Sequence, residues 1–122
     1  MKVISKSIGL DSYGYYRTHL MLINPILPVK LSDKEIEVLA SFMCYIGRTI
    51  YPFSKFCRSE VRKKLGLSHG SLTNYLGRLR EKGFLKLELD AYDFNGLILP
   101  DTDIQEYNFK LIKNEQIEGV TE

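Results

Sequence analysis

The sequence predicts a single α+β domain, in which helices precede a pair of antiparallel strands. Between residues 33 and 82, apolar residues recur at the three- and four-residue spacing of amphipathic helices. From 85 to 90 and from 106 to 111 they alternate with polar residues, as in half-buried strands. A length of 122 residues with 44% hydrophobic residues fits one globular domain and excludes a disordered chain.

The first thirty residues are expected to form a β-hairpin extension. Residues 1–10 are rich in Val, Ile and Ser, residues 11–14 have the composition of a turn, and residues 15–23 are aromatic and apolar. Pro25 and Pro28 then interrupt the pattern, because proline lacks a backbone donor and restricts the residue before it. We therefore expect the extension to cover residues 1–30.

A first helix is expected to begin at a capping box and to end at Gly47. The Ser32 hydroxyl can accept a hydrogen bond from the Glu35 amide, while the Glu35 carboxylate accepts one from the Ser32 amide. The apolar face of this helix would consist of Ile36, Leu39, Ala40, Met43 and Ile46.

Two further helices joined by a three-residue turn are predicted next. Ser59 can cap a short helix over residues 60–65, although Ser54 could start it earlier. Gly66 ends this helix, and Ser68 caps a longer helix over residues 69–82. The buried stripe of the longer helix would comprise Leu72, Tyr75, Leu76 and Leu79, and its outward face Gly70, Asn74 and Gly77.

An antiparallel wing is predicted beyond Gly83. Its strands are expected over residues 85–90 and 106–111, with a long tip over residues 91–104 between them. Residues 31–112 would then form one domain, and residues 113–122, which lack apolar periodicity, a frayed tail.

The charge of the chain is unevenly distributed, although its formal net value is only +2. Residues 55–86 contain nine Lys and Arg and only two acids. Residues 87–122 have the opposite balance, with two Lys and nine acids. A dense cluster of cations is typical of a protein that binds a polyanion, but a solvated helical face can have a similar composition.

The segment SEVRKKLGLSHGSLTNYLGRLREKGFLKLE resembles the winged helix-turn-helix domain of MarR-like bacterial and phage regulators. The resemblance extends over about residues 31–112. It implies a double-stranded DNA-binding transcriptional regulator that inserts helix 69–82 into the major groove. The residues implied nearest the bases or phosphates are Ser68, His69, Ser71, Thr73, Asn74 and Arg78.

The basic cluster adds three candidate phosphate ligands, Arg62, Lys63 and Lys64. They could instead be a solvated helical edge, but the other cations near them in sequence favour phosphate contact. Asn74 could pair with adenine in the major groove, or it could be ordinary solvent-exposed surface. The wing departs from the family pattern, since residues 88–109 contain six acids and no Lys or Arg. Such a wing would repel phosphate, so we do not expect it to contact DNA.

The main alternative is a winged-helix protein-interaction module in a larger assembly, with its acidic wing docked on a protein partner. An enzyme is not expected, because no nucleophile, metal-ligand or phosphate-loop motif is present. Cys44 and Cys57 lack the spacing of a metal or redox site, so neither a metal nor a cofactor is predicted. No apolar run is long enough to cross a membrane, and a cytoplasmic protein acting as a homodimer on paired half-sites is expected.

Overall fold

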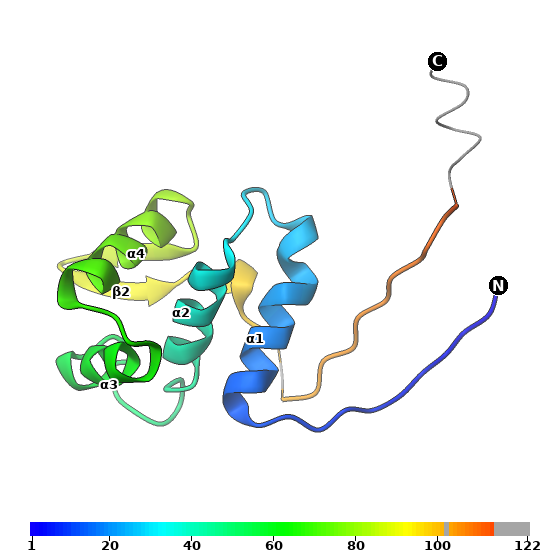
Figure 1. Ribbon diagram of the computed structural model, residues 1–122, viewed down its shortest axis with the longest axis horizontal. Helices are drawn as coiled ribbons and strands as arrows, with labels where there is room; N and C mark the ends of the chain where they lie inside the picture. The colour runs from blue at the N-terminus through cyan, green and yellow to red at the C-terminus, as the bar shows by residue number, and fades with distance from the viewer. Residues whose placement is uncertain (102, 114–122) are drawn as a thin grey trace, which may run out of the picture.

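The computed structural model describes residues 1–101 and 103–113, and these contain four α-helices and one two-stranded antiparallel sheet (Figure 1). The elements are α1 (Ser12–Ile23), α2 (Asp33–Met43), α3 (Lys55–Leu65), α4 (His69–Glu81), β1 (Leu85–Glu88) and β2 (Ala91–Phe94). Short 3-10 turns, η1 (Asn24–Ile26) and η2 (Gly96–Ile98), follow α1 and β2. The predicted α+β class is confirmed.

The N-terminal β-hairpin predicted for residues 1–30 is wrong, because residues 12–23 form helix α1. Asp11 caps this helix through its side chain, which accepts the Gly14 N–H at 2.7 Å. His19 and Leu20 are buried on its inner side. Residues 1–10 contain no strand and extend away from α1 as an exposed arm (Figure 1). The helix forms despite its aromatic content because packing of one face outweighs intrinsic propensity.

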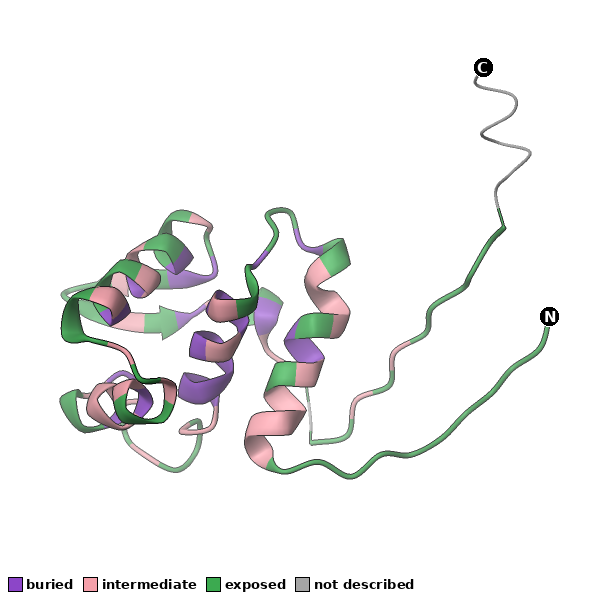
Figure 2. Ribbon diagram, viewed as in Figure 1, coloured by how far each residue is buried: buried purple, intermediate pink, exposed green. Residues whose placement is uncertain are grey.

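Helix α2 begins at the predicted capping box. Ser32 Oγ accepts the Glu35 N–H at 3.2 Å, and Glu35 Oε1 accepts the Ser32 N–H at 2.7 Å. The helix ends at Met43, earlier than predicted, and turns lead to Gly47, whose φ is +76°. Helix α1 packs on one side of α2, and α3 and α4 pack on the other (Figure 1). This central position explains why α2 is the most buried helix (Figure 2).

The predicted helix pair is present, although α3 begins earlier than residue 60. Ser54 is its cap, since Ser54 Oγ accepts the Cys57 N–H at 3.2 Å. Gly66 ends α3 with a φ of +64°, and α4 follows almost at the predicted bounds. The buried residues of α4 are Leu72, Leu76 and Leu79.

The hairpin differs from the predicted wing, which had a second strand over residues 106–111 and a long tip over 91–104. Strand β1 instead pairs with β2, in a register that places Leu85 opposite Phe94. The turn consists of Leu89 and Asp90, whose φ values of +50° and +60° suit a tight hairpin. The described residues 103–113 contain no strand. Only residue 113 of the predicted tail (113–122) lies within the described part of the chain.

An aromatic cluster connects the hairpin to the helices. The Phe53 ring lies 4.6 Å from that of Phe42 on α2 and 4.8 Å from that of Phe94 on β2, between ring centroids. Burial of Phe94 holds β2 against the core and thereby selects it as the partner of β1. Among the described residues, no helix has the length and apolar character needed to span a bilayer.

Candidate nucleic-acid interface

The turn between α3 and α4 is determined by local backbone chemistry. Gly66 adopts the left-handed conformation that favours glycine, and its N–H donates to the Arg62 carbonyl. The Leu67 N–H donates to the same carbonyl at 3.0 Å, so the chain leaves α3 abruptly. Ser68 is extended and its Oγ accepts the Ser71 N–H at 3.1 Å, which starts α4. The two helices are therefore held together by a short, hydrogen-bonded connection.

The outward side of α4 is a polar ridge of small side chains. Gly70, Thr73 and Asn74 are exposed, and Gly77 is half-buried. A Cβ atom added at Gly70 or Gly77 would meet no heavy atom within 4 Å. The ridge is thus free of bulky side chains, and a partner could approach the helix backbone closely.

Arg80 extends this ridge, although it was not among the predicted site residues. It is exposed and lies seven residues, about two helical turns, after Thr73. The sequence contained the signal for Arg80, because residues seven positions apart lie on the same face of an α-helix. Arg78 is also exposed, and its guanidinium carbon lies 5.2 Å from the Tyr75 ring centroid.

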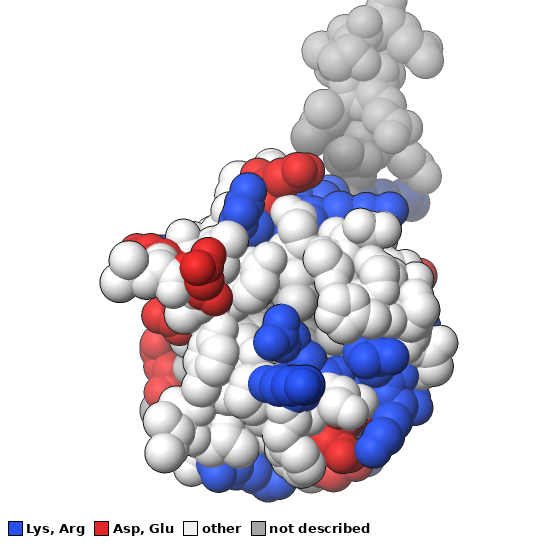
Figure 3. Space-filling model, turned by 90° about the vertical axis from the view of Figure 1, so that its left-hand side faces the viewer, with Lys and Arg blue, Asp and Glu red and all other residues white. Residues whose placement is uncertain are grey.

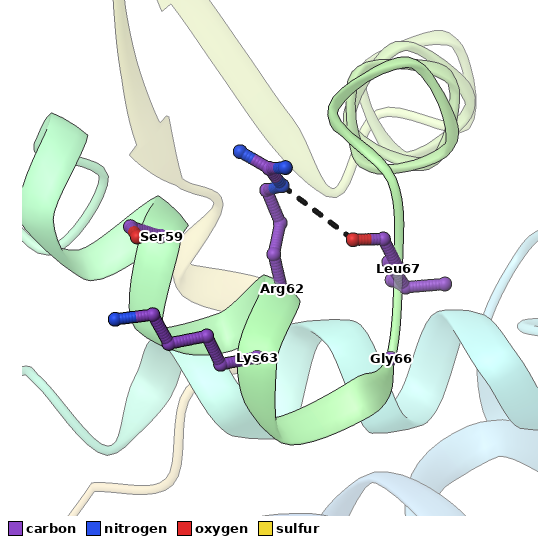
Figure 4. A pocket seen from close by; sticks show the side chains of 5 residues that line it. All are labelled: Ser59, Arg62, Lys63, Gly66 and Leu67. Atoms are coloured by element: carbon purple, nitrogen blue, oxygen red, sulfur yellow. Dashed lines mark hydrogen bonds between the residues drawn. The ribbon is translucent and has the colours of Figure 1, made fainter.

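Arg62 and Lys63 border a hollow of about 200 Å³ on α3 and the following turn. Its lining residues are Ser59, Arg62, Lys63, Gly66 and Leu67 (Figure 4). Arg62 points from α3 toward α4, and its Nε donates to the Leu67 carbonyl oxygen at 3.5 Å (Figure 4). Lys63 is directed back along α3 toward Ser59 (Figure 4). Its ammonium lies 3.7 Å from Glu60 Oε1. Both side chains therefore line this hollow, where Arg62 contacts the turn that leads into α4 and the Lys63 ammonium is directed away from that turn.

Lys64 is separated from Arg62 and Lys63, although the three residues are adjacent in sequence. Its ammonium lies 3.3 Å from the centroid of the Tyr13 ring, which belongs to α1. A cation over an aromatic face is attracted to it electrostatically. The structure therefore directs Lys64 toward α1 and away from the ridge of α4.

The hydroxyl groups of the predicted site serve the helix itself. The Ser68 hydroxyl donates to Ser71 Oγ at 3.0 Å, and the Thr73 hydroxyl donates to the His69 carbonyl at 2.9 Å. By contrast, the exposed Asn74 amide has no hydrogen-bond partner within the described part of the chain. Asn74 is accordingly the polar side chain best placed on this ridge to bind an external group.

The acidic residues of the predicted wing fall into two separate groups. Glu88, Asp90 and Asp93 are exposed on the hairpin. Asp103, by contrast, lies beside α1, where it lines a hollow together with Tyr15 and Tyr16. Figure 3 views the molecule from the side of α3 and α4, and Lys and Arg gather in the centre and lower right of this face. Acidic side chains lie mainly toward its left margin (Figure 3).

Comparisons of the chain with protein-family models, with curated proteins and with solved structures find no match. Over residues 1–101 and 103–113, no cluster of three or more His, Cys, Asp or Glu side chains is arranged to hold a metal ion.

Proposed function

We propose that this chain is a winged helix-turn-helix protein that binds double-stranded DNA through α4 and acts in transcriptional control. The order of α2, α3, α4 and the β-hairpin is compatible with such a domain. One observation carries the proposal. The outward side of α4 is a ridge of small and polar side chains, and cations lie toward both of its ends. Arg62 and Lys63 of α3 lie at one end, and Arg78 and Arg80 lie toward the other.

This arrangement fits the dimensions and charge of a DNA major groove. The groove is about 12 Å wide and accepts an α-helix, and small residues on the inserted face let the helix approach the bases. In the proposed complex the Asn74 amide pairs with a base edge, because an amide can both donate to and accept from adenine. The exposed guanidinium of Arg80 and the Lys63 ammonium contact phosphates and supply affinity that does not depend on sequence.

The remaining predicted residues have supporting roles in this proposal. The hydroxyls of Ser68, Ser71 and Thr73 form hydrogen bonds within the first turns of α4. His69 is exposed at the first position of α4, where the backbone N–H groups and the helix dipole favour a phosphate.

Binding of the full chain to an arbitrary duplex at increasing salt tests the proposal. We expect the logarithm of the binding constant to fall linearly with the logarithm of the salt concentration, because cations displace counterions from DNA. The double variant Lys63→Gln, Arg80→Gln should weaken binding and reduce the magnitude of the slope by about two. Lys64→Gln is the matched control, since Lys64 is directed toward Tyr13, and it should leave the slope nearly unchanged.

Selection from random duplexes tests the base contact separately. Asn74→Ala should alter the selected sequence while leaving nonspecific affinity nearly intact, since a base contact mainly carries information. An identical selected sequence before and after the substitution would remove Asn74 from the proposal. Equal salt dependence of the parent and the Lys63, Arg80 variant would contradict the phosphate contacts.

A protein-interaction module is the second candidate, and the tip of the hairpin favours it. Leu89 is fully exposed there between the acidic residues Glu88 and Asp90. An exposed leucine with acidic neighbours suits a partner that offers an apolar pocket with a basic rim. Failure of the parent to bind any duplex at low salt would favour this candidate.

A further inference from the structure

The ridge of α4 offers few hydrogen-bonding groups to a partner. Gly70 and Gly77 have no side chain, and the Thr73 hydroxyl already donates to the His69 carbonyl at 2.9 Å. The Asn74 amide is exposed and has no hydrogen-bond partner within the described part of the chain. The hydrogen bonds that this ridge can make to a base are therefore those of the Asn74 amide.

Thr73 presents its methyl group rather than its hydroxyl. Its Cβ carries both groups, and the hydroxyl is turned back to the carbonyl one helical turn earlier. The side chain is nevertheless exposed. Because the hydroxyl is occupied within the helix, the methyl group is the part of Thr73 that remains for a partner, and it offers an apolar contact.

The ridge is poorly equipped to recognise guanine. Bidentate recognition of guanine in the major groove uses the side chains of Arg or Lys. Residues 70–77 contain neither. The Arg78 guanidinium carbon lies 5.2 Å from the Tyr75 ring centroid, and Arg80 follows three residues after Gly77, near the end of α4. The middle of the ridge therefore has no side chain suited to a G·C base pair.

An A·T base pair matches the groups that the ridge does offer. In the major groove adenine presents the N7 acceptor beside the N6 donor, and thymine presents its C5 methyl group. The Asn74 amide can donate to N7 and accept from N6, while the Thr73 methyl group can pack on the thymine methyl group. At a G·C pair the amide oxygen would face the O6 acceptor, and cytosine has no methyl group. An A·T pair therefore satisfies both side chains, and a G·C pair satisfies neither.

The geometry of α4 permits both contacts together. Thr73 and Asn74 are consecutive, so they differ by about 1.5 Å along the helix axis, which is less than the roughly 3.4 Å between base pairs. A Cβ atom added at Gly70 or Gly77 would meet no heavy atom within 4 Å. The space beside these two side chains is therefore open to methyl groups that project from the bases.

We propose that α4 selects DNA sites with A·T base pairs at their centre, where Asn74 binds adenine and the Thr73 methyl group contacts a thymine methyl group. This inference rests on the proposed function and adds the class of sequence that the interface takes. Thr73 is a specificity-determining residue in this arrangement, because its methyl group distinguishes thymine from cytosine.

Selection from random duplexes by the full chain tests the sequence class. We expect A·T pairs at the centre of the selected site and weaker preference toward its ends, where phosphates supply the contacts. Replacing the selected adenine with 7-deazaadenine, which lacks the N7 acceptor, should weaken binding of the parent about fivefold or more. Asn74→Ala should bind the two duplexes equally.

Uracil in place of thymine tests the methyl contact, because it removes the C5 methyl group and retains base pairing. At one thymine of the selected site, uracil should weaken binding of the parent about threefold to fourfold, the effect of one buried methyl group. Thr73→Ser keeps the hydroxyl and removes the protein methyl group, so it should bind the thymine and uracil duplexes equally. Thr73→Val keeps a methyl group and removes the hydroxyl, so it should retain the uracil effect.

Thr18→Ser is the matched control, because it removes a methyl group from α1, which α2 separates from α4 (Figure 1). This variant should retain the uracil effect. Circular dichroism and thermal unfolding verify that each variant is folded. Thr73 and Asn74 are exposed, so their substitution should leave the domain intact.

Two results would overturn the inference without affecting the proposed function. One is salt-dependent duplex binding with a G·C centre or with no selected sequence, and the other is an equal uracil effect in the parent and in Thr73→Ser. Failure of the parent to bind any duplex at low salt would overturn both proposals. The two kinds of failure are therefore distinguishable.

Discussion

The ammonium of Lys82 lies 2.6 Å from Glu35 Oε1 and joins the end of α4 to the beginning of α2. Glu35 is almost completely buried, and the same oxygen accepts the Ser32 N–H of the capping box. Burial opposes the charged form of Glu35, but the hydrogen bonds from Lys82 and Ser32 more than offset this effect and lower the pKa of Glu35. Lys82 also donates to the Lys30 carbonyl at 2.8 Å. One ammonium thus holds three segments together.

Removing this ammonium should destabilise the fold. Lys82→Met would leave the Glu35 carboxylate buried without its cation, at a cost of about 2–3 kcal/mol in the free energy of unfolding. Lys34→Met is the control, because the partly exposed Lys34–Glu37 pair should contribute less than about 1 kcal/mol. Urea unfolding of both variants measures the difference. Equal losses would show that the Glu35–Lys82 contact behaves as a surface ion pair.

His19 should make stability depend on pH. Its Nε2 donates to the Ile98 carbonyl oxygen at 2.9 Å, and Nδ1 faces the Tyr107 hydroxyl. Burial lowers the pKa of His19 below its ordinary 6.5, although the Ile98 carbonyl acts in the opposite direction. The unfolded chain therefore binds a proton first, and the stability contributed by neutral His19 should fall as the pH drops below about 6.5.

Urea unfolding at about pH 7.5 and about pH 5.5 measures this effect. His19→Gln should reduce the difference in stability between the two pH values. His69→Gln, at the other histidine of the chain, should preserve the difference, because His69 is exposed. The assignment to His19 fails if the two variants behave alike.

Gly77→Ala should affect stability and DNA binding in opposite directions. A methyl group at Gly77 meets no heavy atom within 4 Å, so replacement of glycine inside α4 should stabilise the fold by about 0.5–1 kcal/mol. The same methyl group would stand on the ridge and keep DNA away, which should weaken duplex binding severalfold. Thermal unfolding and duplex titration on one sample measure both. Unchanged affinity would indicate that this ridge does not face DNA.

Neutralising the hairpin should strengthen duplex binding modestly at low salt. Asp90→Asn, Asp93→Asn removes two negative charges near the proposed interface, and screening should abolish the gain at high salt. The fold should tolerate both changes, because asparagine accepts the positive φ of Asp90 and, in place of Asp93, retains a side-chain oxygen to accept the Phe94 N–H. Asp101→Asn, Asp103→Asn is the control, since Asp103 lies beside α1. A similar gain in the control would argue against a local effect.

Short-range signals in the sequence predicted the helical elements from α2 onward. The capping box at Ser32 and Glu35, the Ser68 cap and the left-handed Gly66 act through backbone hydrogen bonds within three to five residues. Because such interactions need no distant partner, the sequence alone determined where α2 and α4 begin and where α3 ends. The outward ridge of α4 could also be predicted from the sequence, because the periodicity of a helix places residues three and four apart on one face.

Tertiary packing decided the remaining features. Residues 12–23 have the composition of a strand, but burial of His19 and Leu20 against the rest of the domain favours a helix. The 106–111 segment alternates like a strand, yet Ala91–Phe94 pairs with β1 because Phe94 packs against Phe53. The position of Tyr13 on α1 likewise directs Lys64 away from its neighbours. Each outcome depends on which distant residues share the core, and a local pattern does not contain that information.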